Sequence, residues 1–198
     1  MASAETYITD EQLQFLDHIH DLIINDAVIK GTDRKGKVVE FHHPAELTQL
    51  MDFTLGEEGC SHQALLKSCK DTIHYSVKTG HPQFLNQIFA GLDVYGVAGS
   101  WITDCLNTSQ YTYEVAPVFT MMEQEVFQHL KRMAGFTSGD GLFSPGGSVS
   151  NMYGLSLSRY HRFPEVKTKG MQVLPKVCIF TSQTSHYSIM KSAAWMGM

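Results

Sequence analysis

The stretch Phe-Ser-Pro-Gly-Gly-Ser-Val-Ser-Asn at residues 143–151 constrains the fold most, because it joins a short apolar run to a helix through a turn suited to close ligand approach. Gly146 and Gly147 carry no Cβ, so the backbone there can adopt positive φ. The amides of residues 148–150 would open the helix without intrahelical partners, and such amides at the positive end of a helix favour an anion. The stretch predicts a phosphate-binding turn, with an ordinary turn and helix cap as the alternative.

The residues around this turn narrow the choice of fold. No Gly-Lys-Ser/Thr follows, so the turn is not a nucleotide P-loop. The three-glycine fingerprint of dinucleotide-binding folds is also missing. A helical segment through about Arg159 and a polar connection at 164–175 lead to residues 176–181, a compact apolar run typical of a buried strand. His186 follows, just before another helix start. A histidine at the C-terminal end of a strand, facing a phosphate-binding helix, lies where α/β sheets bind ligands.

From about Lys67 onward the chain carries ordered sequence blocks. They read Thr-Gly-His-Pro (79–82), Phe-Leu-Asn-Gln-Ile-Phe-Ala-Gly-Leu-Asp (84–93), Leu-Asn-Thr-Ser-Gln-Tyr-Thr-Tyr-Glu-Val-Ala-Pro-Val-Phe (106–119), Gly-Asp-Gly (139–141), Ser-Pro-Gly-Gly-Ser-Val-Ser-Asn-Met-Tyr (144–153) and Ser-His-Tyr-Ser (185–188). These blocks resemble a known family, the group II pyridoxal-phosphate-dependent amino acid decarboxylases, in its branch for acidic substrates. The first two blocks are most similar to the cysteine sulfinate and aspartate decarboxylases of animals, more than to glutamate decarboxylases.

The resemblance implies a domain organisation. It implies the α/β large domain of the PLP-dependent transferase-like fold (fold type I), truncated and preceded by an N-terminal helical segment. Residues 1–66 would be that segment and would pack on the partner subunit of a homodimer. Residues 67–198 would be the first part of the domain that binds pyridoxal 5'-phosphate.

The resemblance also assigns roles to single residues. The backbone at Gly147, Ser148 and Val149 would hold the cofactor phosphate. His186 would be catalytic, stacking its imidazole on the pyridine ring of the cofactor. The alternative for His186 is a polar residue in a helix-entry loop, bonded to nearby backbone.

Four residues match the substrate pocket of the family: Gln87, Phe89, Ser109 and Tyr111. The ring of Phe89 would shorten the pocket, so that glutamate fits poorly while aspartate or cysteine sulfinate fits. The hydroxyls of Ser109 and Tyr111 could donate to the distal acid group. The alternative is that Phe89 only fills the core beside the pocket.

The function implied for the full-length protein is decarboxylation of cysteine sulfinate to hypotaurine, of aspartate to β-alanine, or of both. The Schiff-base lysine, the aspartate that pairs with the pyridine nitrogen and the arginine that binds the substrate carboxylate come after Met198 in this family. We therefore expect an N-terminal fragment that is inactive alone. The alternatives are a glutamate decarboxylase, another fold-type I enzyme such as an aminotransferase, and a truncated isoform that acts only through subunit association.

Composition excludes several other classes. The net charge of −5, without a basic cluster, argues against a nucleic-acid surface. The N-terminus has no secretory signal, and no apolar run has the length of a membrane span, so we expect a cytoplasmic protein. The four cysteines are too far apart for a zinc or redox motif and are expected to be reduced and mostly buried, and the ten histidines show no metal-ligand spacing.

Helical periodicity is clear in four further segments. Apolar spacing predicts one amphipathic helix over Asp10 to Ile29, with Asp10 as its cap and Gly31 as its stop. Two shorter helices are expected at 44–51 and near 62–77. The clearest helix is expected over 117–134, with Gly135 after it and an apolar stripe that packs in the core.

Overall fold

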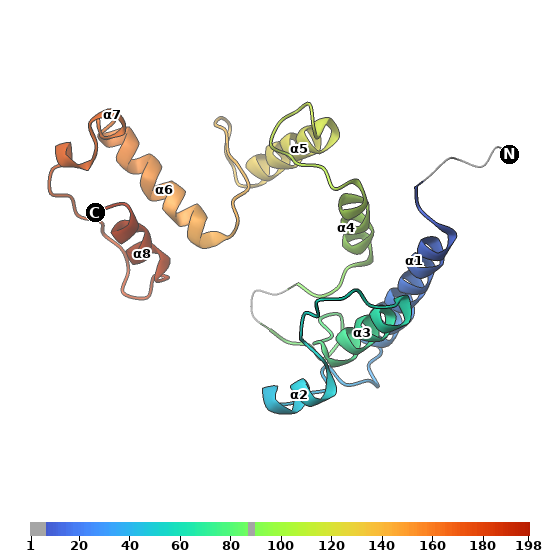
Figure 1. Ribbon diagram of the computed structural model, residues 1–198. Helices are drawn as coiled ribbons and strands as arrows, with labels where there is room; N and C mark the ends of the chain where they lie inside the picture. The colour runs from blue at the N-terminus through green and yellow to red at the C-terminus, as the bar shows by residue number, and fades with distance from the viewer. Residues whose placement is uncertain (1–6, 87–89) are drawn as a thin grey trace. The chain divides into compact units, whose positions relative to one another are not determined.

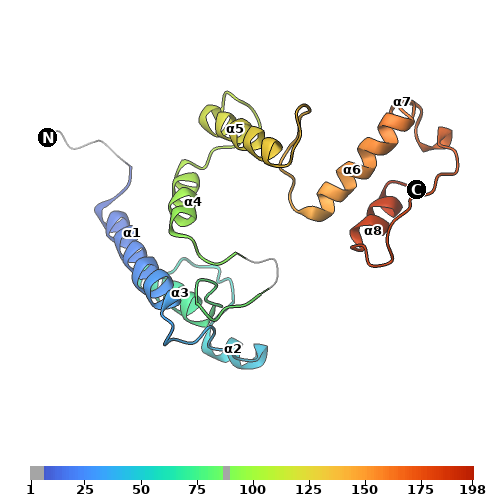
Figure 2. The same cartoon turned by 180° about the vertical axis from the view of Figure 1, so that it is seen from behind.

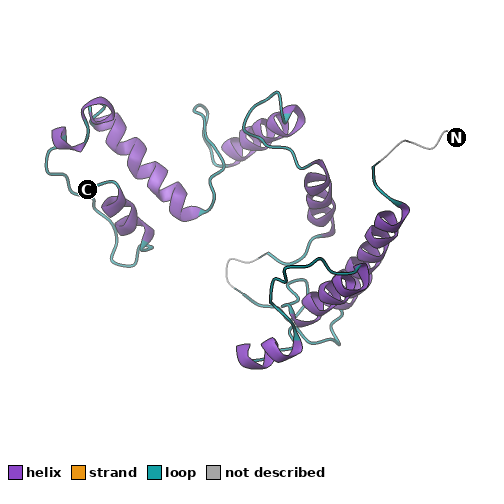
Figure 3. Ribbon diagram, viewed as in Figure 1, coloured by secondary structure: helices purple, strands orange, loops and turns teal. Residues whose placement is uncertain are grey.

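The computed structural model describes residues 7–86 and 90–198, and these residues form helices and loops without a strand (Figures 1 and 3). The chain divides into two compact units, Met1–Thr108 and Ser109–Met198. This division rests on contacts within each unit and differs from the predicted domain boundary at residue 66, which stays a prediction. The first unit contains α1 (Asp10–Leu22), a π-helix (Ile23–Ile29), a 3-10 turn (Lys30–Thr32), α2 (Pro44–Leu50), α3 (His62–Tyr75) and α4 (Val94–Leu106). The second contains α5 (Pro117–Met133), α6 (Gly147–Arg162), α7 (Val166–Lys169), a 3-10 turn (Met171–Val173) and α8 (Ser188–Trp195).

Helix α1 begins with a capping box. Thr9 Oγ1 accepts from Gln12 N at 3.2 Å, and Gln12 Oε1 accepts from Thr9 N at 2.9 Å. The prediction of Asp10 as the cap is therefore wrong by one residue, since Asp10 is already helical and contributes its charge to the first turn. The predicted single helix exists, but it widens into the π-helix after Leu22 and ends in the 3-10 turn that contains Gly31.

Helices α1 and α3 pack against each other in the first unit and lie side by side in Figures 1 and 2. The rings of Phe15 and His62 have centroids 4.9 Å apart, and His62 Nδ1 lies 3.3 Å from Glu11 Oε1. The helix predicted near residues 62–77 is confirmed as α3, with Ser61 as its N-cap.

His81 joins two loops of the first unit. Its side chain is 2% exposed, Nδ1 accepts from Gln83 N at 3.1 Å, and Nε2 lies 3.2 Å from Gly36 O. Because Nδ1 is an acceptor, the hydrogen of the neutral ring is on Nε2, which donates to Gly36 O. The loop after the 3-10 turn is thereby fixed to the loop after α3, where Lys78 N also donates to Val38 O at 2.8 Å.

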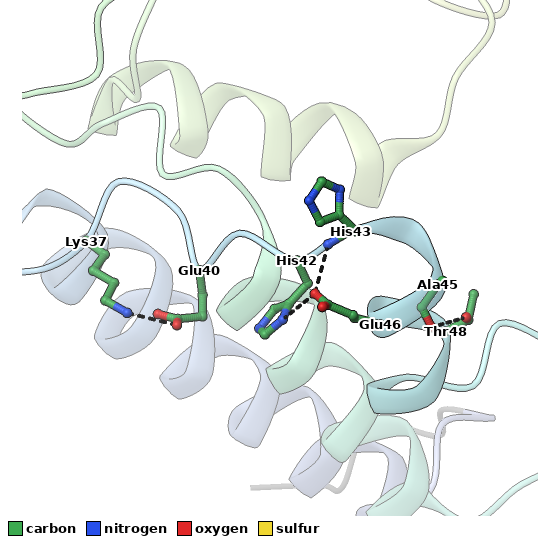
Figure 4. Close-up of polar contacts among 7 residues, drawn as sticks. All are labelled: Lys37, Glu40, His42, His43, Ala45, Glu46 and Thr48. Carbon is green, nitrogen blue, oxygen red and sulfur yellow. Dashed lines mark hydrogen bonds and ion pairs between the residues drawn. The ribbon is translucent and has the colours of Figure 1, made fainter.

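Helix α2 is held at its start by one glutamate (Figure 4). Glu46 Oε2 accepts from His43 N at 3.2 Å and lies 3.7 Å from His42 Nδ1. In the preceding loop, Lys37 Nζ donates to Glu40 Oε1 at 2.8 Å, and this hydrogen bond lowers the pKa of Glu40 below its usual value. The short helix thus begins at Pro44, as predicted.

Helix α4 was not predicted. Asp93 caps it, accepting from Gly96 N at 2.7 Å, and Asn107 ends it with a φ of +45°. Gly96 and Gly99 lie inside the helix, and interior glycines lower helix propensity. The cap and stop residues were the signals that could have identified it.

Helix α5 has the predicted apolar stripe, but the prediction that this stripe packs in the core is wrong. Met122, Val126 and Met133 are 57%, 51% and 73% exposed. The face is therefore largely exposed among the described residues of this unit. The helix itself starts at Pro117 and is followed by Gly135, whose φ is +83°, as the sequence predicted.

Helices α6 and α8 form a parallel pair. Asn151 Nδ2 donates to Ser188 Oγ at 2.8 Å, and Arg159 Nη1 donates to Met196 O at 2.9 Å. Both bonds join residues 37 positions apart, and this constant offset means that the two helices run in the same direction. Parallel neighbours need a connection that crosses back between them, and α/β folds supply it as a strand.

The connection contains the segment predicted as a strand, at residues 176–181. This prediction is wrong for the described residues, because the segment has no ladder of hydrogen bonds and Phe180 in it is 95% exposed. A strand exists only beside a second strand, and none is present in the part of the chain that the structure describes. The segment nevertheless occupies the place of the crossing strand between two parallel helices.

Candidate functional site

The turn at the start of α6 has the backbone shape that the sequence predicted. Gly146 is the N-cap, with a φ of +108° and a ψ of 160°, and Gly147 is the first helical residue. A Cβ placed on either glycine would meet no atom within 4 Å. The space in front of the helix end is therefore open to a ligand.

Fewer amides are free at this end than predicted. Val149 N and Ser150 N donate to Gly146 O, at 3.1 and 3.2 Å, because the first turn closes tightly on that carbonyl. In the part of the chain that the structure describes, the amides of Gly147 and Ser148 have no such partner. The first turn of α6 carries no acidic residue, so its positive end stays uncompensated. Two free amides and the exposed Ser148 hydroxyl fit a phosphate group.

The structure brings His186 to the second helix of this pair. Ser188, the first residue of α8, is 1% exposed and bonds to Asn151 on α6. His186 Nδ1 lies 2.8 Å from Ser188 Oγ and accepts from Ser188 N at 3.2 Å. The Tyr187 ring lies beside that of His186, with centroids 4.3 Å apart. The predicted phosphate turn and the predicted stacking histidine are thus linked through one buried hydroxyl.

A cavity of about 260 Å³ lies between the start of α6 and one side of α8. Its lining includes Ser148, Val149, Tyr187 and Lys191, but not His186. Lys191 is exposed, and its Nζ lies 4.8 Å from the centre of the Tyr187 ring. A larger cavity of about 470 Å³ lies beside α5 and includes none of the predicted site residues. The smaller cavity is the one that belongs to the candidate site.

The predicted substrate residues are only partly described. Gln87 and Phe89 lie outside the described residues. Ser109 and Tyr111 are exposed in the loop before α5, and no hydrogen bond or ring contact links them to α6 or α8 in the described chain. Gln110 between them donates from Nε2 to Phe119 O at 3.0 Å and to Glu123 Oε2 at 2.8 Å.

Sequence reasoning missed three positioning residues: Gln110, which ties the loop to α5, and Asn151 and Ser188, which join α6 to His186. All three lie inside the blocks that carry the family resemblance. Their contacts reach over 9 to 37 positions of sequence, so local patterns could not reveal them.

Other kinds of site find no support in the described chain. No group of three or more histidine, cysteine, aspartate or glutamate side chains gathers there as a metal site. The four cysteines are free, as predicted, but the prediction that most are buried is wrong: Cys69 is half-buried and the other three are exposed. None of the described helices is long and apolar enough to cross a membrane.

Comparison with known proteins agrees with the family that the sequence resembles. The conserved domain of pyridoxal-dependent decarboxylases matches residues 44–198. Cysteine sulfinic acid decarboxylase of Mus musculus is 50% identical over 183 residues, covering 92% of this chain and 37% of that relative. Acidic amino acid decarboxylase GADL1 of Xenopus tropicalis is 44% identical over 185 residues, covering 93% and 36%.

A solved structure extends the likeness to three dimensions. A crystal structure of mouse CSAD has a TM-score of 0.90 at 49% identity, covering 93% of this chain and 39% of that one. The predicted fold class, the α/β large domain of fold type I, is thereby confirmed. The chain spans little more than a third of the length of the relatives that it matches.

Proposed function

Because this chain belongs to the pyridoxal-dependent decarboxylase family, we propose that the protein containing it removes the α-carboxyl group of a small acidic amino acid. The proposed cofactor is pyridoxal 5'-phosphate. The proposed substrates are cysteine sulfinate, which would give hypotaurine, and aspartate, which would give β-alanine. The names of the two relatives, which refer to cysteine sulfinic acid and to acidic amino acids, support this substrate class.

The observation that carries the proposal is the linkage of the α6 turn to His186 within one unit. The free amides of Gly147 and Ser148 would donate to the cofactor phosphate, with the helix end favouring its charge. Val149 would line the cavity wall and would not donate to the phosphate, since its amide already donates to Gly146 O. His186 would lie against the cofactor ring and fix its tilt.

The bound cofactor would supply the electron-withdrawing ring that accepts the electron pair left by departing carbon dioxide. The described residues would bind and orient. The α6 turn would hold the phosphate and His186 would stack on the ring, and orientation of a reacting group by such contacts is worth large factors in rate.

We predict that His186→Ala lowers kcat of the full-length enzyme at least about tenfold, or about 1.4 kcal/mol, because the ring loses its tilt. Phosphate binding should survive, so cofactor occupancy should stay near that of the wild type. His161→Ala, an exposed histidine at the other end of α6, is the matched control and should leave kcat unchanged. Wild-type kcat in a fully loaded His186→Ala enzyme would remove His186 from the site.

The substrate preference is proposed to depend on Gln87, Phe89, Ser109 and Tyr111. The test compares kcat/KM for cysteine sulfinate, aspartate and glutamate before and after Phe89→Ser combined with Ser109→Asn and Tyr111→Phe. The wild type should prefer the two shorter substrates. The expected difference in activation free energy is about 1–3 kcal/mol, which is what one methylene is worth, and the triple change should move the ranking toward glutamate. A wild type that prefers glutamate would make the alternative, a glutamate decarboxylase, correct, and an unchanged ranking would refute the pocket.

We also propose that the protein is a homodimer in the cytoplasm and that residues 1–66 contribute to the subunit interface. The support is the resemblance and the exposed apolar side chains of α1, Leu13 and Leu16, which are 45% and 55% exposed. Light scattering of the full-length protein, with and without Leu13→Lys and Leu16→Lys, tests the interface. A dimer that survives both changes would contradict it.

A further inference from the structure

We infer that Ser188 is a positioning residue for His186, and that its buried hydroxyl holds the imidazole of His186 as the Nε2–H tautomer. The inference rests on the proposed function for the value of an oriented ring. The placement of the proton itself follows from hydrogen bonds within this chain.

The first step concerns the Ser188 hydroxyl. Asn151 Nδ2 lies 2.8 Å from Ser188 Oγ, and an amide nitrogen can only donate. Ser188 Oγ therefore accepts from Asn151. A serine hydroxyl has one hydrogen, and that hydrogen remains available for the other neighbour of Oγ, which is His186 Nδ1 at 2.8 Å.

The second step concerns the histidine ring. His186 Nδ1 receives the Ser188 hydroxyl and also the Ser188 backbone N–H, at 3.2 Å. A backbone N–H cannot accept, so a hydrogen on Nδ1 would face another hydrogen there. Nδ1 is thus the bare nitrogen of the neutral ring, and Nε2 carries the hydrogen.

The third step concerns burial. Ser188 is 1% exposed, so water cannot replace its hydroxyl at Nδ1. His186 itself is exposed, and the described chain shows no hydrogen bond at its Nε2. The ring is therefore fixed from its buried edge and presents one N–H donor outward. Asn151 carries this constraint back to α6, the helix whose start forms the phosphate turn.

The experiment places the proton directly. Protein of full natural length is prepared without cofactor and with 15N-labelled histidine, and His186 is identified by the signals lost in His186→Gln. Long-range 1H–15N spectra then show which ring nitrogen bears hydrogen. In the wild type we expect a hydrogen on Nε2 and none on Nδ1. A wild-type ring with its hydrogen on Nδ1 overturns the inference without any further variant.

Two variants remove the constraint in different ways. Ser188→Ala deletes the hydroxyl. Asn151→Asp keeps the size of the side chain at position 151, but its carboxylate would accept the Ser188 hydroxyl hydrogen that His186 Nδ1 receives in the wild type. Each should change the tautomer ratio of His186 at least about fivefold, the factor that losing one hydrogen bond produces in an equilibrium. Asn151→Asp answers the question even if Ser188→Ala does not fold. An unchanged ratio in the folded variants overturns the inference.

The control is Ser192→Ala, which deletes another buried hydroxyl of α8, 4% exposed, that has no bond to His186 in the described chain. It should leave the ratio at the wild-type value. Titration with pyridoxal phosphate separates the two proposals. If the wild-type His186 signals do not move when the cofactor binds, its proposed role beside the ring fails, while the assignment of Ser188 stands or falls on the tautomer alone.

Discussion

At the scale of single residues, this chain fixes histidine rings by giving one nitrogen a backbone donor. His81 Nδ1 accepts from Gln83 N and His186 Nδ1 accepts from Ser188 N, two residues further along in each case. The other nitrogen is then the donor. In His81 that donor is spent on Gly36 O inside the unit, whereas in His186 it stays open to a ligand. The same local geometry serves a structural role in one place and a proposed binding role in the other.

For His81 we predict that His81→Ala lowers the free energy of unfolding by about 2 kcal/mol or more. The change would leave a buried carbonyl and a backbone amide without their partner, and each such loss costs about 1–3 kcal/mol. Chemical denaturation of the full-length protein gives the total loss of stability. Faster hydrogen exchange at Gln83 N would show that the loss arises at this junction. His18→Ala, an exposed histidine of α1, is the control. Equal stability of the two variants would contradict the proposed junction.

At the scale of elements, α1, α3 and α4 each begin at a side-chain cap. Thr9, Ser61 and Asp93 each accept a hydrogen bond from the backbone three residues later. A helix whose start depends on one side chain responds to a single substitution. The same holds for the loop before α5, which Gln110 fixes to that helix.

For α1 we predict that Thr9→Ala costs about 1 kcal/mol, because both bonds of the capping box depend on the geometry of that residue. Circular dichroism during denaturation measures the cost. Thr9→Ser, which keeps the hydroxyl, should leave the stability near that of the wild type, because serine caps helices at least as well as threonine. A loss of the same size in both variants would show that the hydroxyl does not cap the helix.

The sequence predicted those features that a few neighbouring residues decide. Pro117 and Gly135 bracketed α5, and the glycines of the α6 turn gave the positive φ of Gly146. The strand at 176–181 was wrong because a strand needs a distant partner for its backbone groups. Asn151 and Ser188 were not predicted for the same reason, since the role of each depends on its hydrogen bond to the other, 37 positions away.

At the scale of the whole molecule, the chain leaves much of its apolar surface uncovered. Large apolar side chains are exposed in both units, among them Phe41 at 68% and Phe180 at 95%. Ala116 is the only apolar residue among those described that is fully buried. The hydrophobic contribution to stability is therefore small for the chain by itself.

We predict that the isolated 198-residue chain binds an apolar dye strongly and self-associates in sedimentation experiments. The α5 face should contribute, so Met122→Lys with Val126→Lys should reduce both effects, because the lysines repel and interrupt the apolar stripe. Gln124→Lys, on an exposed polar position of the same helix, is the matched control for added charge. A monomer that binds no dye and unfolds in one sharp transition would contradict the prediction.

The constant offset along the α6–α8 pair has a consequence for how this unit folds. Asn151–Ser188 and Arg159–Met196 close loops of the same length, and the two loops share residues 159–188. Once one bond has formed, the entropy of bringing the chain ends together has largely been spent, so the second bond forms at little further entropic cost. The two contacts should therefore appear and disappear together in time, and the ring of His186 should become oriented in the same kinetic step that docks the two helices.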